Sequence, residues 1–203
     1  MIKRPFRNTE LMFPSEEDKF HLDGAIMYSC QYLEELSGRT AIVVGAHVGT
    51  TVLSLKNFKD IHAFEGDTEN FECLKKNVSC QVYNEIISDK EEGFDLADGN
   101  FSTNSGAKYF KPGNKSAKTI DSYNFKDVDL ILVDVEGMDL KVLKGAEETI
   151  KKYRPRIIVE FKHLERYGDS WPKAINYMRS LGYEKASLPF GPTLDREFNY
   201  GHY

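Results

Sequence analysis

A strand–helix–strand pattern in the second half of the chain limits the fold more than any other feature. Residues 128–133 form an apolar run that predicts a buried strand, residues from about 139 to 152 carry a helical pattern, and residues 156–161 form a second apolar run. Pro155 ends the helix because proline has no backbone N–H for the next helical hydrogen bond. Strands joined through a helix in this way lie parallel in one sheet, so the pattern predicts an α/β protein.

Two further strand-to-helix units lie in the first half. Residues 41–44 form an apolar strand that passes through a glycine-containing turn into a helix, and residues 61–65 form a strand followed by a helix that ends near Asn77. Asp67 or Thr68 is the expected N-cap of that helix, because either side-chain oxygen can accept an N–H of its first turn. Successive units of this kind predict a mostly parallel central sheet flanked by helices on both faces.

The remaining segments carry weaker patterns. Residues 21–36 predict an amphipathic helix that packs on the sheet as a lid or flank, and residues 80–88 predict a third strand near a sheet edge or a ligand. Residues 91–118 show no sustained period, and an irregular segment of this length inside a domain is usually functional or mobile. The predicted elements that follow are a helix over 171–181, a strand over 183–187 and an extended end over 196–203.

Length and composition fit a single domain. The chain has 203 residues, and we expect residues 1–39 to form a helical N-terminal flank and residues 40–203 to form the α/β core. A net charge of -5 argues against nucleic acid as a partner. No apolar run is long enough for a membrane span or a signal peptide, and three cysteines without CxxC spacing indicate neither a disulfide framework nor a zinc site. We expect a cytoplasmic protein without membrane binding.

Three features converge at the carboxyl ends of the predicted strands. They are the turn from Gly45 to Gly49, Glu65 at the end of the second strand, and Asp134 with Glu136 after the fourth. Right-handed connections place all of them on one edge of the sheet. Glycine lets a ligand approach the backbone, and an acid at the end of the next strand can accept both hydroxyls of a ribose, so the pattern predicts a nucleoside-type cofactor site.

The glycine turn favours one cofactor over another. A dinucleotide site needs G-x-G-x-x-G, whereas this turn reads G-A-H-V-G and lacks the central glycine. A nicotinamide-dependent oxidoreductase is therefore the weaker interpretation. S-adenosylmethionine has a ribose but no phosphate, and its sulfonium cation suits a site with the carboxylates of Glu65, Asp134 and Glu136.

The chain resembles the FkbM-type S-adenosylmethionine-dependent methyltransferases. The resemblance rests on "VVGAHVGTTVL", "AFEGDTENFECLKKNV", "TIDSY" and "DLILVDVEGMDLKVLKGAEETIKKYRPRIIVEF", in that order, and covers about residues 40–162. D-V-E-G followed by L-K-G-A is its most distinctive part. The resemblance implies a Rossmann-like class I methyltransferase fold and methyl transfer to a hydroxyl of a sugar, glycan or other natural product.

The resemblance also implies roles for particular residues. Gly45, Ala46 and Gly49 line the methionine part of the cofactor, Glu65 holds the ribose hydroxyls, Asp89 after Ser88 lies near the adenine, and Asp134 and Glu136 face the methyl donor and the acceptor. His47 joins the candidate cofactor contacts, although the family usually has Asn there. Val43 and Leu132 also depart from the pattern, since the family usually has Asp and often Lys at these places. A non-catalytic or degenerate cofactor-binding module therefore stays an alternative.

Methyl transfer to oxygen needs an aligned hydroxyl and a base that removes one proton. Asp134 and Glu136 are the candidate bases, with His163 as a competitor. Alternatively, Asp134 and Glu136 bind Mg²⁺ or Mn²⁺, which chelates a vicinal diol and lowers its pKa. Glu136 also has a structural alternative as the cap of the following helix. The expected acceptor is a carbohydrate or glycoside, and residues 100–118 are a candidate acceptor lid.

Overall fold

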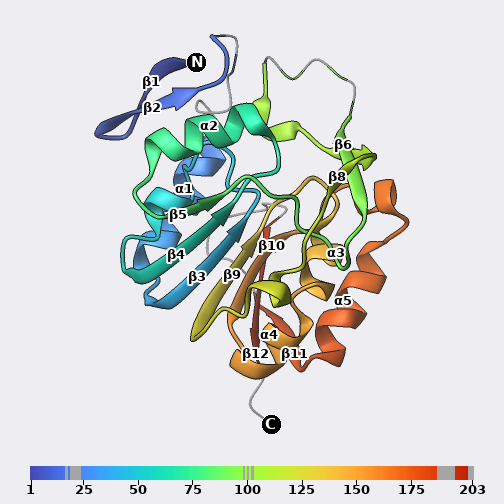
Figure 1. The fold of residues 1–203 in the computed structure, drawn as a ribbon. Helices are drawn as coiled ribbons and strands as arrows, with labels where there is room; N and C mark the ends of the chain where they lie inside the picture. Colours follow the sequence, from blue (N-terminus) through green and yellow to red (C-terminus); the bar gives the residue numbers. More distant parts are fainter. Residues whose placement is uncertain are drawn as a thin grey trace.

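The computed structural model describes residues 1–16, 18, 24–97, 99, 101, 103–186 and 195–200. A seven-stranded sheet with the order β11-β12-β10-β9-β3-β4-β5 forms its centre (Figure 1). The adjacent parallel strands are β10 (Arg156–Glu160), β9 (Val128–Val133), β3 (Gly38–Val44), β4 (Phe58–Phe64) and β5 (Gln81–Tyr83). The predicted mostly parallel α/β sheet is confirmed, with the third predicted strand, β5, at its edge.

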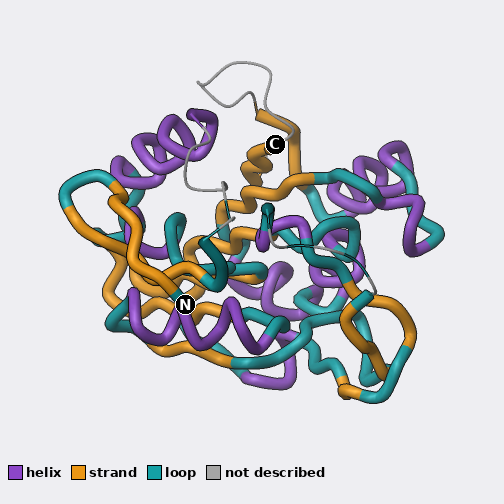
Figure 2. Tube along the Cα trace, turned by 90° about the horizontal axis from the view of Figure 1, so that it is seen from above, coloured by secondary structure: helices purple, strands orange, loops and turns teal. Residues whose placement is uncertain are grey.

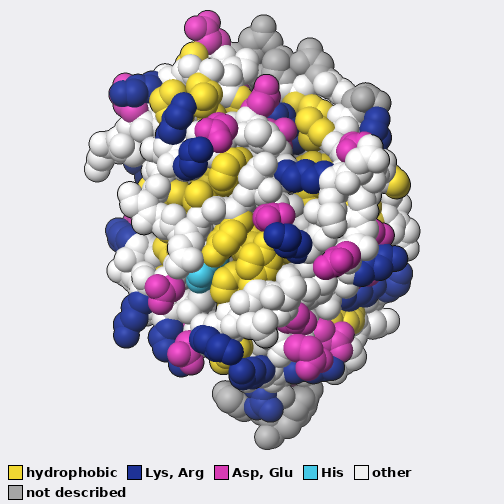
Figure 3. All heavy atoms as spheres, viewed as in Figure 1, with side chains coloured by type: hydrophobic (Ala, Val, Ile, Leu, Met, Phe, Trp, Pro, Cys, Tyr) yellow, Lys and Arg dark blue, Asp and Glu magenta, His cyan; other side chains and the backbone are white. Residues whose placement is uncertain are grey.

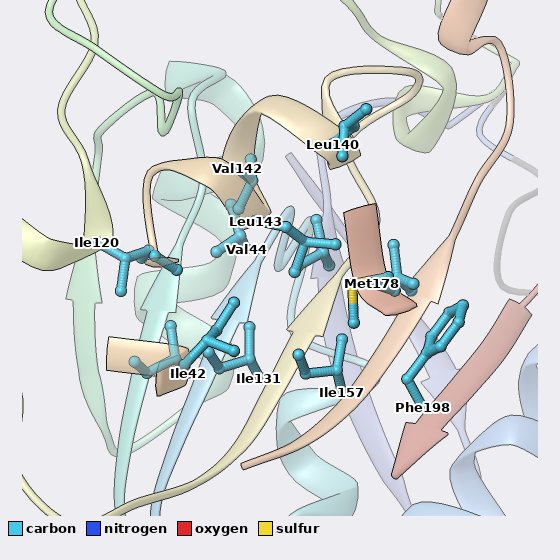
Figure 4. Close-up of a cluster of buried hydrophobic side chains, with 14 of the residues drawn as sticks. Ile42, Val44, Ile120, Ile131, Leu140, Val142, Leu143, Ile157, Met178 and Phe198 are labelled. Atoms are coloured by element: carbon cyan, nitrogen blue, oxygen red, sulfur yellow. The ribbon is translucent and has the colours of Figure 1, made fainter. Parts of the chain in front are cut away.

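Helices cover both faces of this sheet, as Figures 1 and 2 show. One face packs against α1 (Gly24–Glu35) and α2 (Thr68–Asn77), and the other against α3 (Asp139–Lys144), α4 (Glu147–Tyr153) and α5 (Trp171–Ser180). Successive residues of β3 alternate between the two cores: Val43 lies on the α1 side, whereas Ile42 and Val44 lie on the side of Leu143 and Met178 (Figure 4). This alternation follows from the two-residue period of a strand.

Two local signals act as the sequence predicts. Asp67 caps α2, because its Oδ1 accepts the N–H of Asn70 at 2.9 Å. Helix α4 ends at Tyr153, and Arg154 takes a left-handed conformation just before Pro155. Both results follow from the chemistry of single residues: the Asp67 side chain can accept a backbone N–H, and Pro155 has none to donate.

Two predicted helices differ from the prediction. After β3 the chain forms only a short 3-10 turn, η2 (Val52–Ser54), where β-branched residues disfavour an α-helix. The helix predicted over 139–152 is divided into α3 and α4 at Gly145, where a Cβ would lie 2.0 Å from the carbonyl oxygen of Ser88. Close contact with a distant loop therefore determines where the helix divides.

The N-terminal flank is only partly helical. Helix α1 is present, but β1 (Ile2–Phe6) and β2 (Thr9–Phe13) form an antiparallel hairpin ahead of it. Phe6, Leu11 and Phe13 are buried, which shows the two-residue alternation of a strand. Residues 21–23 and the side chains of residues 24–29, which belong to the predicted amphipathic helix, lie outside the described part of the chain.

The segment predicted as irregular contains a small sheet. β6 (Gly93–Leu96) pairs antiparallel with both β7 (Phe110–Pro112) and β8 (Lys115–Ser116), and η3 (Ser105–Ala107) lies between β6 and β7. These strands are two to four residues long, too short to show a period, so the prediction of an irregular segment was wrong. The small sheet stands beside the ends of the central strands (Figure 1).

The end of the described chain completes the large sheet. β11 (Tyr183–Ala186) confirms the predicted strand as far as it is described, and β12 (Asp195–Tyr200) lies antiparallel between β10 and β11. Residues 187–194 and 201–203, which include parts of the predicted strand and extended end, lie outside the described residues. On the face seen in Figure 3, acidic and basic side chains are interspersed rather than gathered by sign.

Candidate functional site

The glycine turn after β3 packs directly on the acidic turn after β9. Gly45 has a φ of 83°, and a Cβ there would lie 1.8 Å from the carbonyl oxygen of Asp134. Glycine permits this approach because it has no side chain and adopts positive φ without strain. The N–H groups of Gly45 and Ala46 both donate to the Phe64 carbonyl, at 3.0 and 2.9 Å. The ends of β3, β4 and β9 are thereby held together.

Glu65, directly after β4, is a buried carboxyl group that receives two backbone N–H groups. His47 donates to Oε2 and Asp67 donates to Oε1, each at 2.8 Å. Burial raises the pKa of Glu65 to about 7, although these two hydrogen bonds act in the opposite direction. A carboxylate has about four acceptor positions, so both oxygens can still accept a hydroxyl.

The turn after β9 holds Glu136 at φ 52° and Gly137 at φ 112°. Arg166, in η5 (Leu164–Tyr167), donates from Nη1 to the Glu136 carbonyl at 3.2 Å and lies 3.5 Å from Glu136 Oε2. His163 Nε2 lies 3.8 Å from the same oxygen. Asp134 is exposed, whereas the Glu136 side chain is only 11% exposed. The two carboxylates therefore have different surroundings.

Asp139 is a residue of this turn that sequence reasoning missed. Its fully buried carboxyl group accepts the N–H of Val135 at 3.2 Å and of Gly137 at 3.1 Å. Burial raises the pKa of Asp139 to about 8. Met138, not Glu136, occupies the N-cap position of α3, so the capping alternative for Glu136 is wrong. An acid in the first turn of a helix just after an acidic turn was the available signal.

A cavity lies between these turns. It encloses about 750 Å³ when the space at its open mouth is included. The predicted residues that line it are Gly45, Ala46, His47, Glu65, Asp134 and Glu136. The structure thus brings most of the predicted site together.

The other predicted residues do not line this cavity. Gly49 packs on α2, where an added Cβ would lie 2.7 Å from Val78 Cγ1. Asp89 lies 3.4 Å from Lys141 Nζ instead of facing the cavity. His163 stands next to Glu136 without lining the cavity.

A strap, residues 105–110, covers part of the cavity. Ser105 Oγ lies 2.5 Å from His47 Nε2 and donates to the carboxylate of Asp18, while the Ser105 carbonyl accepts from Asn70 Nδ2 at 3.0 Å. Burial lowers the pKa of His47 to about 4, so its ring is neutral at pH 7. The strap belongs to the segment predicted as a candidate lid.

Two more strap residues extend the lining. Lys108 is 8% exposed and places Nζ 2.8 Å from Asp67 Oδ1. Phe110 lies against Gly66, where an added Cβ would be 2.8 Å from the Phe110 ring and 3.0 Å from Ile86 Cγ1. The cavity therefore has an apolar slot next to Glu65. Sequence reasoning missed Lys108 and Phe110 because no periodic pattern points to a partner so distant in the chain.

The predicted metal site lacks support from the side chains. Among the described residues, no group of three or more His, Cys, Asp or Glu side chains is placed to hold a metal ion. Asp134 and Glu136 therefore have no third such ligand among the described residues, and no step of the proposed reaction uses a metal ion.

None of the helices in the described ranges is both long and apolar enough to cross a membrane.

Comparison with known families and structures agrees with this geometry. Residues 44–185, more than half of the chain, match the Methyltransferase FkbM domain. This match confirms the resemblance and extends it past residue 162. No curated protein matches the chain.

Several solved structures share the fold. A methyltransferase FkbM from Methylobacillus flagellatus KT superposes with a TM-score of 0.55 at 16% identity, over 81% of this chain and 44% of that one. The chain thus spans less than half the length of that protein. A precorrin-8w decarboxylase from Methanobacterium thermoautotrophicum has a TM-score of 0.52 at 15% identity, over 92% and 97% of the two chains. These similarities show a Rossmann-like fold.

Proposed function

The chain belongs to the FkbM methyltransferase family, and from this we propose that it is an S-adenosylmethionine-dependent O-methyltransferase that methylates a sugar hydroxyl of a glycan or glycosylated product. One observation carries the proposal. Buried Glu65 and the acidic turn with Asp134 and Glu136 line the same cavity, next to the glycine turn, where a Cβ on Gly45 would collide with the Asp134 carbonyl oxygen. A nucleoside with a cationic sulfur fits that combination of groups.

The cavity supplies matching groups for the nucleoside of the proposed cofactor. Glu65 accepts the ribose hydroxyls, and the slot of Gly66, Ile86 and Phe110 is apolar enough for a purine ring. Asn70 lines the cavity at 2% exposure, and its Oδ1 has no hydrogen-bond partner among the described residues. A buried acceptor of this kind favours a ligand that donates a hydrogen bond. When bound, S-adenosylmethionine would supply an electrophilic methyl group.

The chain's own contribution is alignment and proton removal. We assign the proton-accepting role to Glu136, because its carboxylate lines the cavity and is mostly shielded from water. Arg166 and His163 lie beside it, so they can stabilise its position and charge. Exposed Asp134 faces the cavity from the same turn and is suited to the cationic part of the cofactor.

Calorimetric titration tests the cofactor. We expect micromolar binding of S-adenosylmethionine and S-adenosylhomocysteine, and an affinity about tenfold lower or worse in Glu65→Ala because two backbone donors lose their acceptor along with the ribose. Glu85→Gln is the matched control, since Glu85 lines the cavity but pairs with Lys118. Absence of binding in wild type, or binding of NADH instead, would overturn the proposal.

Methyl transfer is tested with a panel of glycosides and free sugars. S-adenosylhomocysteine formation should depend on the glycoside, and Glu136→Gln should lower kcat more than Asp134→Asn does. His163→Asn should have a smaller effect than either. Transfer to non-carbohydrate acceptors alone would contradict the proposed acceptor class while leaving the methyltransferase activity intact.

A cofactor-binding module without catalysis is the second candidate, and Val43 favours it. Val43 is fully buried in the core under α1, so β3 presents no carboxylate to the cavity at the place where the family usually has Asp. Tight S-adenosylhomocysteine binding without methyl transfer to any hydroxylated acceptor would support this candidate.

A further inference from the structure

A single carboxyl group holds both neighbours of Glu136. Asp139 Oδ1 accepts the N–H of Val135 at 3.2 Å, and Asp139 Oδ2 accepts the N–H of Gly137 at 3.1 Å. Asp139 has no solvent exposure, and Gly137 is buried as well. Without this carboxyl group the Gly137 amide would lose its partner in a place that water does not reach, and a buried amide left without a partner is unfavourable.

The turn needs this support because its backbone is in a costly conformation. Glu136 has a φ of 52°, a left-handed conformation that is unfavourable for residues other than glycine. Gly137 cannot carry a side chain, since a Cβ would lie 2.4 Å from the carbonyl oxygen of His163. Arg166 holds the turn from the other side through the Glu136 carbonyl. Asp139 therefore holds the backbone on both sides of Glu136 in a strained turn.

We propose that Asp139 is a positioning residue for methyl transfer, whose carboxyl group fixes the backbone of the 135–137 turn and so directs the Glu136 carboxylate into the cavity. The assignment rests on the proposed function for its catalytic part. Asp139 is not among the residues that line the cavity. It acts through the two amides alone.

The chain offers a matched control for this role. Asp121, in η4 (Ile120–Tyr123), accepts the N–H groups of Glu148 and Thr149 at 3.0 and 2.9 Å, so it also holds two backbone amides at a helix start. Asp121 is outside the cavity. A general effect of removing such a carboxylate on stability should appear in both Asp121→Asn and Asp139→Asn.

The first test needs no catalysis. The backbone N–H resonances of Val135 and Gly137 should move with pH as Asp139 ionises, with a midpoint well above that of an ordinary aspartate because burial raises the pKa of this group. Other groups facing this region are Glu160, His163, Arg166 and Tyr167. Loss of the transition in Asp139→Asn, but not in His163→Asn, assigns it to Asp139.

Amide hydrogen exchange measures the same contacts directly. In Asp139→Asn the amides of Val135 and Gly137 should exchange about 10-fold to 100-fold faster, and those of Glu148 and Thr149 should not change. Asp121→Asn should give the reverse. Unchanged protection of Val135 and Gly137 in Asp139→Asn would overturn the assignment.

A double-variant comparison separates positioning from bulk stability. With a glycoside acceptor from the panel, Asp139→Asn should lower kcat by about tenfold or more and leave the KM for S-adenosylmethionine within about threefold. The loss in Asp139→Asn/Glu136→Gln should equal that of Glu136→Gln alone, because residues acting through one group are not additive. Additive losses would overturn the positioning role. Absence of S-adenosylhomocysteine binding in wild type would instead reject the proposed function, with the exchange result unaffected.

Discussion

At the scale of single residues, burial sets the charge of the groups around the cavity. Burial holds the His47 ring neutral at pH 7, with its pKa lowered to about 4. The same cause raises the pKa of Glu65 to about 7, so this carboxyl group changes charge near neutral pH. Of these two groups, Glu65 is therefore the one that couples cofactor binding to pH.

We predict that S-adenosylhomocysteine binds about tenfold more tightly at pH 8 than at pH 6. Ribose hydroxyls donate to the ionised carboxylate, so binding favours the ionised form of Glu65 and lowers its pKa below the free value of about 7. Binding near pH 7 should then release protons from the fraction of molecules in which Glu65 is protonated, which calorimetry in buffers of different ionisation enthalpy measures.

The control for this pH effect is Glu85→Gln, which should keep both the pH dependence and the proton release. Glu65→Gln should lose both along with affinity. An affinity that does not vary from pH 6 to pH 8 in wild type would contradict the assignment of Glu65 to the ribose.

At the scale of elements, contacts with distant loops interrupt local patterns. The sequence from 139 to 152 has the composition of one helix, yet α3 and α4 are separate because Gly145 passes against the Ser88 carbonyl. Asp121 in η4 then holds the first amides of α4. The division places α3 directly after the acidic turn, with Asp139 at its first position.

We predict that Gly145→Ala lowers the free energy of unfolding by about 1–3 kcal/mol. Helix propensity alone would give the opposite sign, a gain of about 1 kcal/mol for replacing glycine by alanine. The steric effect dominates because the new Cβ would lie 2.0 Å from a backbone oxygen. Urea unfolding measures the difference, and a stabilised variant would show that the close approach is absent.

Gly168→Ala is the comparison variant for Gly145→Ala. Its added Cβ meets no atom within 4 Å, although φ is 73°. Only the conformational cost of about 1 kcal/mol should then remain.

At the scale of the whole molecule, segments at both ends complete the central sheet and its surroundings. The N-terminal hairpin is joined to α2 by the Asn77 side chain, which pairs with the N–H and carbonyl of Met12 at 2.7 and 3.0 Å and also donates to the Val48 carbonyl at 2.8 Å. β12 separates β10 from β11, with Phe198 buried against Phe161. Both ends of the described chain therefore contribute to one folded unit.

We predict that Asn77→Ala lowers the free energy of unfolding by about 2–3 kcal/mol, because three backbone groups lose their partner. The affinity for S-adenosylhomocysteine should also fall, since Val48 belongs to the glycine turn. Asn57→Ala is the control, because the Asn57 side chain makes one exposed hydrogen bond, with the Glu34 carbonyl. Equal affinity in Asn77→Ala and wild type would show that the hairpin is not coupled to the turn.

We predict that Phe198→Ala lowers the free energy of unfolding by about 3–5 kcal/mol, the usual cost of removing a buried aromatic ring. Trp171→Ala removes another ring that contacts Phe161 but is 37% exposed, so its cost should be clearly smaller. Denaturant unfolding compares the two. Similar decreases in the free energy of unfolding would indicate that β12 does not contribute to the stability of the sheet.

The sequence by itself determined the features that depend on neighbouring residues. The apolar runs of the parallel strands, the Asp67 cap, the end of α4 before Pro155 and the acids at the strand ends are all local. Right-handed connections then brought Gly45, Glu65 and Asp134 to one edge, which is why most of the predicted site could be identified.

The tertiary structure alone decided which distant groups meet. It divided the predicted helix at Gly145, paired the short strands β6, β7 and β8, inserted β12 beside β10, and directed Asp89 to Lys141. It also placed Asp139 under Glu136 and Lys108 beside Asp67. A periodic pattern records that a face is buried, but the partner that buries it is chosen by packing among residues far apart in the chain.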